Sequence, residues 1–189
     1  DIIAKHEKRR EKTSHPLARK SVRVDRVDSR NLTDLATHFT FELFSPHMED
    51  MDSSNNSSIV LKLTGLDQTG FSYLITGDTE TERWDSINRF FGESLFSPVM
   101  AAPHHGSSNG VNPRTLLLVE PHTVLISAGV DNSYGHPDGA AVQAYQLVAK
   151  HVFCTNASPG GTCFFTRHVG DDYQTLPVEH FDSVTAMAS

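Results

Sequence analysis

The sequence lacks most features of secreted and membrane-spanning proteins. Its two cysteines, Cys154 and Cys163, are too few among 189 residues for a disulfide framework. They flank a Gly-rich turn between two predicted strands, so a cross-strand bridge is conceivable. We favour two reduced thiols, because free cysteine is commonly buried, and this weakly suggests a reducing compartment. No apolar run approaches the roughly 20 residues of a membrane span, and no secretory signal pattern occurs.

These absences lead us to expect no membrane segment in this chain and a cytoplasmic location, although the parent protein could be membrane-associated. Residue 1 is Asp rather than Met, so we expect a fragment or a processed product.

Basic residues are scarce outside the first 30 positions. Residues 1–30 hold 10 Lys and Arg against 5 acids, whereas residues 31–189 hold 6 against 18. The basic segment could contact phosphate groups, but we favour a solvated leader or linker. The acidic remainder argues against a broad nucleic-acid surface, although a bound metal ion would reverse the field locally.

The hydrophobic pattern predicts antiparallel strands followed by alternating strands and helices. Strands are expected at 21–27, 39–44, 59–63, 71–75, 98–102, 123–127, 151–154 and 162–166. Helices are expected at 5–12, 79–91, 112–119 and 138–150. This order predicts a layered α/β or α+β domain at 31–168, after a leader at 1–30 and before a peripheral tail at 169–189.

Three polar motifs each follow a predicted strand directly. They are Thr76-Gly77-Asp78, Pro103-His104-His105-Gly106-Ser107 and Gly135-His136-Pro137. Ligands of sheet-based α/β proteins gather beyond the carboxyl ends of strands, so we expect the three loops to converge. Each motif alone has an ordinary explanation as a turn, a helix cap or a loop. Together they favour a metal site.

The residue types indicate hydrolytic chemistry. A carboxylate and neutral imidazoles suit zinc, manganese or iron. Such a metal lowers the pKa of bound water towards ~7 and supplies hydroxide, while a nearby imidazole can donate a proton to a leaving oxygen. His47 begins a loop after a strand and is a lesser candidate. The remaining histidines are interpreted as surface or structural residues: His6, His15, His38, His122, His151, His168 and His180.

The ordered set of motifs, together with Asn55-Asn56-Ser57-Ser58, resembles one family. It looks like the metallo-β-lactamase-fold domain of the ComEC-like group, named for a bacterial DNA-uptake protein, over about residues 40–167. The resemblance implies the C-terminal half of an αββα sandwich, with one or two divalent metal ions, zinc or manganese, at one edge. It also implies hydrolysis of phosphoester bonds, often in nucleic acids.

On this resemblance, Asp78 is a bridging metal ligand and His136 a second metal ligand. His104 and His105 are the catalytic residues that contact the scissile group or assist the leaving group. Asn56 orients the site, and Ser107 hydrogen-bonds a phosphate oxygen.

The sequence departs from the family pattern in lacking the His-x-His-x-Asp-His motif of the N-terminal half. We therefore expect a metal-dependent phosphodiesterase or nuclease that is active only with that half, from the same domain or another subunit. Two alternatives stay open. One is a degenerate, non-catalytic module that binds a partner, and the other is a hydrolase of a non-phosphate ester or amide.

Overall fold

The computed structural model describes residues 39–46, 54–66, 71–157, 163–169 and 172–178. Several predictions lie outside these residues: the leader at 1–30, the helix at 5–12, the strand at 21–27, and the placement of His6, His15, His38, His47 and His180.

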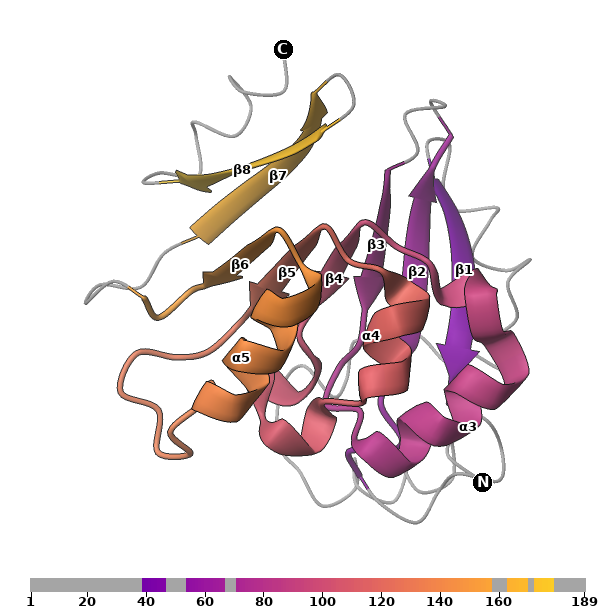
Figure 1. Cartoon of the computed structure of the whole chain (residues 1–189), viewed down its shortest axis with the longest axis horizontal. Helices are drawn as coiled ribbons and strands as arrows, with labels where there is room; N and C mark the ends of the chain where they lie inside the picture. The colour runs from indigo at the N-terminus through magenta and orange to yellow at the C-terminus, as the bar shows by residue number, and fades with distance from the viewer. Residues whose placement is uncertain (1–38, 47–53, 67–70, 158–162, 170–171, 179–189) are drawn as a thin grey trace, which may run out of the picture.

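A six-stranded mixed sheet forms the centre of the described chain (Figure 1). Its strands lie in sequence order: β1 (Phe39–Ser45), β2 (Val60–Gly65), β3 (Ser72–Ile75), β4 (Val99–Ala101), β5 (Thr123–Ile126) and β6 (His151–Cys154). β1, β2 and β3 pair antiparallel, and β3 to β6 pair parallel. The predicted order of antiparallel strands followed by alternating strands and helices, and the layered α/β class, are therefore confirmed.

Three helices cover one face of this sheet. They are α3 (Thr81–Phe91), α4 (Pro113–Val119) and α5 (Gly139–Val148). Each connects two neighbouring parallel strands, and crossovers of this kind share one hand. Sequential strand order then places every helix on the same face, as Figure 1 shows. Short 3-10 turns, η2 (Gly92–Leu95), η3 (Pro103–Gly106) and η4 (Ser108–Gly110), complete the connections.

The core lies between these helices and the sheet. Trp84 and Ile87 of α3 are fully buried against sheet residues such as Leu74 and Met100. Phe90 also fits the apolar spacing of this helix in the sequence, but its side chain is 66% exposed. Asn88 takes the inward position instead, because its amide hydrogen-bonds Asn112 and Thr115.

The opposite face of the sheet is also apolar. The strand registers place Leu61 beside Ile75, Leu63 beside Tyr73, and Leu125 beside Phe153. All six alternate with the residues that face the helices, and all are half-buried. Among the described helices, none packs on this face (Figure 1).

The last described strands, β7 (Cys163–Val169) and β8 (Asp172–Val178), form a separate antiparallel pair. β7 confirms the strand predicted at 162–166, but β8 lies in the segment predicted as a tail. Its Pro177 weakens the strand pattern, and pairing with β7 supplies the hydrogen bonds that the pattern does not reveal. Cys154 is a free thiol, as predicted, and the side chain of Cys163 is outside the described residues.

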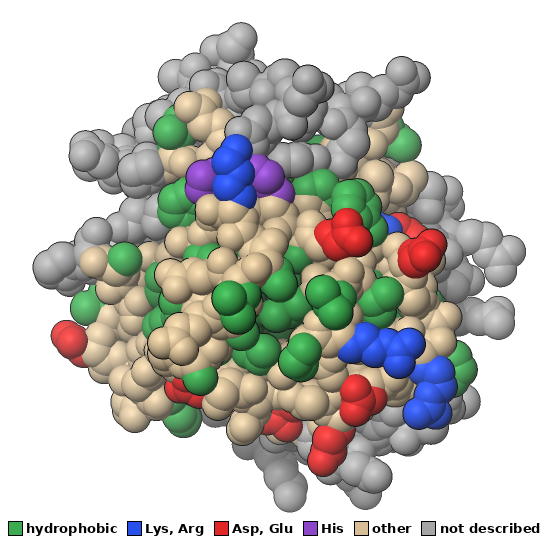
Figure 2. Space-filling model, viewed as in Figure 1, with side chains coloured by type: hydrophobic (Ala, Val, Ile, Leu, Met, Phe, Trp, Pro, Cys, Tyr) green, Lys and Arg blue, Asp and Glu red, His purple; other side chains and the backbone are tan. Residues whose placement is uncertain are grey.

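The helix-covered side of the molecule carries exposed apolar side chains between polar ones (Figure 2). Leu117 and Leu147 are 68% and 86% exposed. None of the helices in the described ranges is long and apolar enough to cross a membrane.

Candidate functional site

The loops that follow β3, β4 and β5 meet at one edge of the sheet, as the sequence predicted. These strands are parallel neighbours, so their carboxyl ends lie at the same edge. The backbone N–H of His104 donates to the carbonyl of Gly77 at 3.0 Å, and that of Asp138 donates to the carbonyl of Gly106 at 2.9 Å. The main chain thus joins the second motif to the first motif and to the residue that directly follows the third.

Two glycines allow this close approach. Gly77 and Gly106 have φ values of 54° and 80°, in the left-handed region that favours glycine. A Cβ atom on Gly77 would lie 2.8 Å from the Cβ of Ser58, and one on Gly106 would lie 2.7 Å from the Cβ of Pro137. Neither position has room for a side chain.

The two adjacent histidines have an uncommon backbone conformation. His104 and His105 have φ values of 49° and 56° within η3. Such a conformation costs a residue other than glycine roughly 1–2 kcal/mol. Strain of this kind is concentrated at functional sites, where the surrounding structure maintains it.

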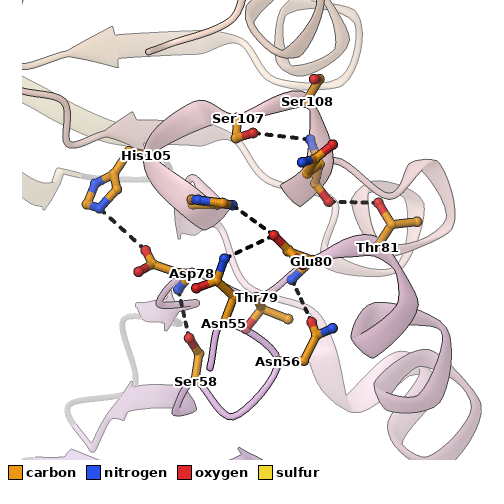
Figure 3. A network of polar contacts seen from close by, with 12 residues as sticks. Asn55, Asn56, Ser58, Asp78, Thr79, Glu80, Thr81, His105, Ser107 and Ser108 are labelled. Atoms are coloured by element: carbon orange, nitrogen blue, oxygen red, sulfur yellow. Dashed lines mark hydrogen bonds and ion pairs between the residues drawn. The ribbon is translucent and has the colours of Figure 1, made fainter. Parts of the chain in front are cut away.

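His105 connects the first two motifs. Its Nδ1 atom lies 2.7 Å from the backbone carbonyl oxygen of Ser127, and its Nε2 atom lies 3.4 Å from Oδ1 of Asp78. Figure 3 shows the Asp78 carboxylate pointing toward the His105 ring. The backbone N–H of Asp78 donates to Ser58 Oγ at 2.9 Å. A carbonyl oxygen only accepts, so Nδ1 of His105 carries a proton and Nε2 faces the carboxylate.

His104 faces a different carboxylate. Its buried Nδ1 atom lies 3.5 Å from Oε1 of Glu80 and has no hydrogen bond of ordinary geometry. The same Glu80 oxygen accepts a hydrogen bond from the Asn55 amide at 3.0 Å. Figure 3 shows the side chains of Asn55 and Glu80 pointing toward one another. The Glu80 backbone N–H donates to Asn56 Oδ1 at 3.1 Å.

His136 joins the third loop to this group. Its ring packs edge to face on that of His104, with 5.7 Å between centroids, and Tyr134 stacks against it at 6.0 Å. Its Nδ1 atom lies 3.3 Å from Oδ1 of Asp138. The other oxygen of Asp138 accepts the backbone N–H of Ser108 at 2.7 Å. That hydrogen bond, aided by the contact with His136, lowers the pKa of the Asp138 carboxyl.

The predicted substrate-binding residues lie beside the site and hydrogen-bond its backbone. Asn56 accepts from Glu80, as described above. Ser107 is buried, and its hydroxyl oxygen accepts the backbone N–H of Asn109 at 3.3 Å, at the start of η4. The roles of these residues in binding substrate stay predictions, as do the roles of Asp78, His104, His105 and His136.

Sequence reasoning missed the two acidic residues whose carboxylates face the histidine rings, Glu80 and Asp138. Asp138 and Glu80 lie at the starts of the helices predicted at 138–150 and 79–91, where an acid is ordinarily explained by the helix itself. Both occupy N-cap positions, yet neither side chain caps its helix. The available signal was an acid two residues after Asp78 and another two residues after His136.

Two histidines interpreted as structural lie elsewhere. His122 precedes β5 and His151 begins β6, at the edge of the sheet opposite the site, and their rings pack at 5.3 Å. Within the part of the chain that the structure describes, no group of three or more Cys, His, Asp or Glu side chains is arranged to hold a metal ion.

The sequence is similar to bacterial competence proteins. The ComE operon protein 3 of Bacillus subtilis (strain 168) is 32% identical over 133 residues, which cover 70% of this chain and 16% of that protein. The competence protein ComA of Neisseria gonorrhoeae is 32% identical over 100 residues, which cover 53% of this chain and 14% of that protein. The chain therefore matches only a small part of either relative.

These similarities are consistent with the ComEC-like group to which the motifs point. No family model matches the chain, and no solved structure matches it significantly. The metallo-β-lactamase fold and the hydrolytic activity stay predictions.

Proposed function

We propose that this chain supplies one half of a metal-dependent hydrolase site for phosphodiester bonds, with Asp78 and His105 as ligands of the same cation. The observation that carries the proposal is the 3.4 Å contact between Asp78 Oδ1 and His105 Nε2. It differs from the role expected from sequence, in which His105 acted on the scissile group.

The reason lies in the proton on His105. Because Nδ1 donates to the Ser127 carbonyl, Nε2 of the neutral ring carries a lone pair directed at a carboxylate oxygen. Two acceptor atoms that face each other repel unless positive charge lies between or beside them. Either a proton on Nε2 or a shared cation would satisfy both atoms. Carboxylate and imidazole together suit zinc or manganese.

His136 is the proposed further ligand. Its Nδ1 faces Asp138, and metal-binding histidines commonly hold a carboxylate through the nitrogen that does not bind the metal. A divalent cation held by these residues would supply Lewis-acid chemistry toward a phosphoryl oxygen. His104, between Glu80 and His136, keeps the predicted role of proton transfer at the leaving oxygen.

The remaining ligands and the second layer of the fold are proposed to come from another segment. Each zinc ion in a protein is normally held by three or four protein ligands. Asp78, His105 and His136 provide three ligands in all, which is too few for a pair of metal ions. The parallel part of the sheet has an apolar second face, and parallel sheets are ordinarily covered on both faces. A second β layer there would complete an αββα sandwich.

The phosphodiester substrate is proposed from the resemblance and the relatives. The ComEC-like group implies phosphoester hydrolysis, often in nucleic acids, and the relative from Neisseria gonorrhoeae is named a competence protein. Fold alone does not fix the substrate of a hydrolase, so this part of the proposal needs its own test.

Metal binding is tested by titrating Zn²⁺ and Mn²⁺ into the native chain and into Asp78→Ala, His105→Ala and His136→Ala variants. Each substitution is expected to weaken binding by more than the roughly 10–100-fold that loss of an outer partner costs. His122→Ala, at the opposite edge of the sheet, is the control and should bind as the native chain does. Equal affinity in native chain and Asp78→Ala variant would refute the site.

The substrate is tested with a longer protein that contains this chain. A panel of bis(p-nitrophenyl) phosphate, single-stranded DNA, a phosphomonoester, a thioester and a lactone separates the possibilities. Metal-dependent cleavage of the first two is expected, with loss of activity in Asp78→Ala. Turnover of only the thioester or lactone would assign a different bond, and metal binding without turnover would favour a binding module.

A further inference from the structure

We infer that Glu80 and Asp138 are positioning residues that fix the tautomers of His104 and His136, so that each ring exchanges a proton or binds a cation only through Nε2. Neither acid was a candidate from sequence. The consequence for a bound cation rests on the function proposed above, whereas the tautomers themselves do not.

The Asp138 carboxylate is oriented toward His136 by a hydrogen bond from a different loop. One carboxylate oxygen accepts the Ser108 N–H at 2.7 Å, which fixes the orientation of the carboxylate. The other oxygen lies 3.3 Å from Nδ1 of His136. The His136 backbone is fixed as well, because its N–H donates to Asn132 Oδ1 at 3.0 Å and its carbonyl accepts the Asn132 amide at 2.8 Å.

Glu80 is held in a comparable way. The Asn55 amide donates to its carboxylate, and its own N–H donates to the side chain of Asn56. It faces the Nδ1 atom of His104, which is buried without another hydrogen-bond partner. Buried polar atoms in native proteins nearly always have a partner. Glu80 is the acceptor that the described structure offers to this atom, after a small closure from 3.5 Å.

The two acids share a second property that a purely structural role does not explain. Both occupy the N-cap position of a helix, where a side-chain oxygen ordinarily accepts a backbone N–H of the first turn. Asp is one of the residues that most often cap a helix in this way. Both carboxylates are directed at a histidine instead, so α3 and α5 begin without that stabilisation.

The third histidine follows the same rule with a different acceptor. His105 directs Nδ1 to the carbonyl of Ser127. All three rings therefore place Nδ1 against a fixed acceptor. Which nitrogen carries the proton is set by the hydrogen bond of the other one, so all three neutral rings have an unprotonated Nε2. Three imidazoles in one tautomer are suited to ligation and to directed proton transfer.

The tautomers are measured by long-range ¹H–¹⁵N correlation of the histidine rings in the metal-free 189-residue chain, in buffer basic enough to keep the rings neutral. Signals are assigned with His104→Gln and His136→Gln variants. In the native chain, both rings are expected to be protonated at Nδ1 only. Glu80→Ala should shift His104, and Asp138→Ala should shift His136, toward the Nε2-protonated form.

Matched variants separate positioning from general loss of structure. Glu80→Gln and Asp138→Asn retain an acceptor oxygen and should restore the native tautomers. Glu82→Ala, an exposed acid of the same helix turn, and Asp131→Asn, an exposed acid of the same loop, should leave both rings unchanged. An Nε2-protonated His104 or His136 in the native chain would overturn the inference, even if the alanine variants do not fold.

Zinc affinity provides a second measurement. Loss of an outer carboxylate commonly weakens metal binding by roughly 10–100-fold, and this is expected for Asp138→Ala, because its partner His136 is a proposed ligand. Glu80→Ala, whose partner His104 is not a proposed ligand, and the control variants should bind zinc as the native chain does. Equal zinc affinity in the native chain and the Asp138→Ala variant would overturn the proposed positioning of His136 as a ligand. If the native chain shows the expected tautomers but binds no zinc or manganese, the proposed function fails while the positioning of the rings stands.

Discussion

Replacement of Gly106 by alanine tests whether the loop that carries His104 and His105 is in close contact with the loop that carries His136. Gly106 has a φ of 80°, and an added Cβ would lie 2.7 Å from the Cβ of Pro137 and 3.0 Å from Cγ2 of Ile126. The left-handed backbone costs alanine about 1–2 kcal/mol. A methyl group forced into a filled space costs about 1–3 kcal/mol more. We therefore expect Gly106→Ala to lower the free energy of unfolding by about 2–5 kcal/mol.

The control for this prediction is Gly135→Ala. Gly135 has a similar φ of 73°, but an added Cβ would meet no atom within 4 Å. Only the conformational cost of about 1–2 kcal/mol should remain. Urea unfolding followed by the fluorescence of Trp84, the single tryptophan, gives both values. Equal losses in the two variants would show that the loops do not approach each other as described.

Three further predictions concern the fold and its dependence on pH. Ile87→Ala removes a fully buried side chain and should lower the free energy of unfolding by about 2–5 kcal/mol. Phe90→Ala, at an exposed position of the same helix, should change it by less than about 0.5 kcal/mol. The urea midpoints of the two variants measure this difference. Gly139→Ala, at the start of α5 with open space around the new Cβ, should raise stability by about 0.4–1 kcal/mol, measured by thermal unfolding. The Ser108 N–H, with a contribution from His136, lowers the pKa of Asp138, so its stabilisation is present at neutral pH and is lost as pH falls through the native pKa. The stability difference between native chain and Asp138→Asn should therefore narrow in acid, and a constant difference across pH would contradict the assigned cause.

Sequence patterns predicted most of the described elements, because local periodicity reports which face of a segment is buried. They failed where a distant partner changed the outcome. Phe90 fits the helical stripe, but the Asn88 amide takes the inward position through contacts with Asn112 and Thr115. β8 has a weak pattern and gains its structure by pairing with β7.

The candidate site divides in the same way. Its convergence was predictable, because Asp78, His104, His105 and His136 each follow a parallel strand. Its carboxylate partners were not predictable. Local rules assign Asp138 to a helix cap, and only the approach of Ser108 from another loop redirects its carboxylate.

The sequence by itself determined which loops meet at the candidate site, since the order of strands and helices places their ends at one edge of the sheet. Tertiary structure alone decided which nitrogen of each ring faces an acceptor. That choice depends on atoms from segments far apart in the chain, such as Glu80 for His104 and Ser127 for His105. Hydrogen bonds act over about 3 Å, and no pattern of residue types along a chain specifies distances on that scale.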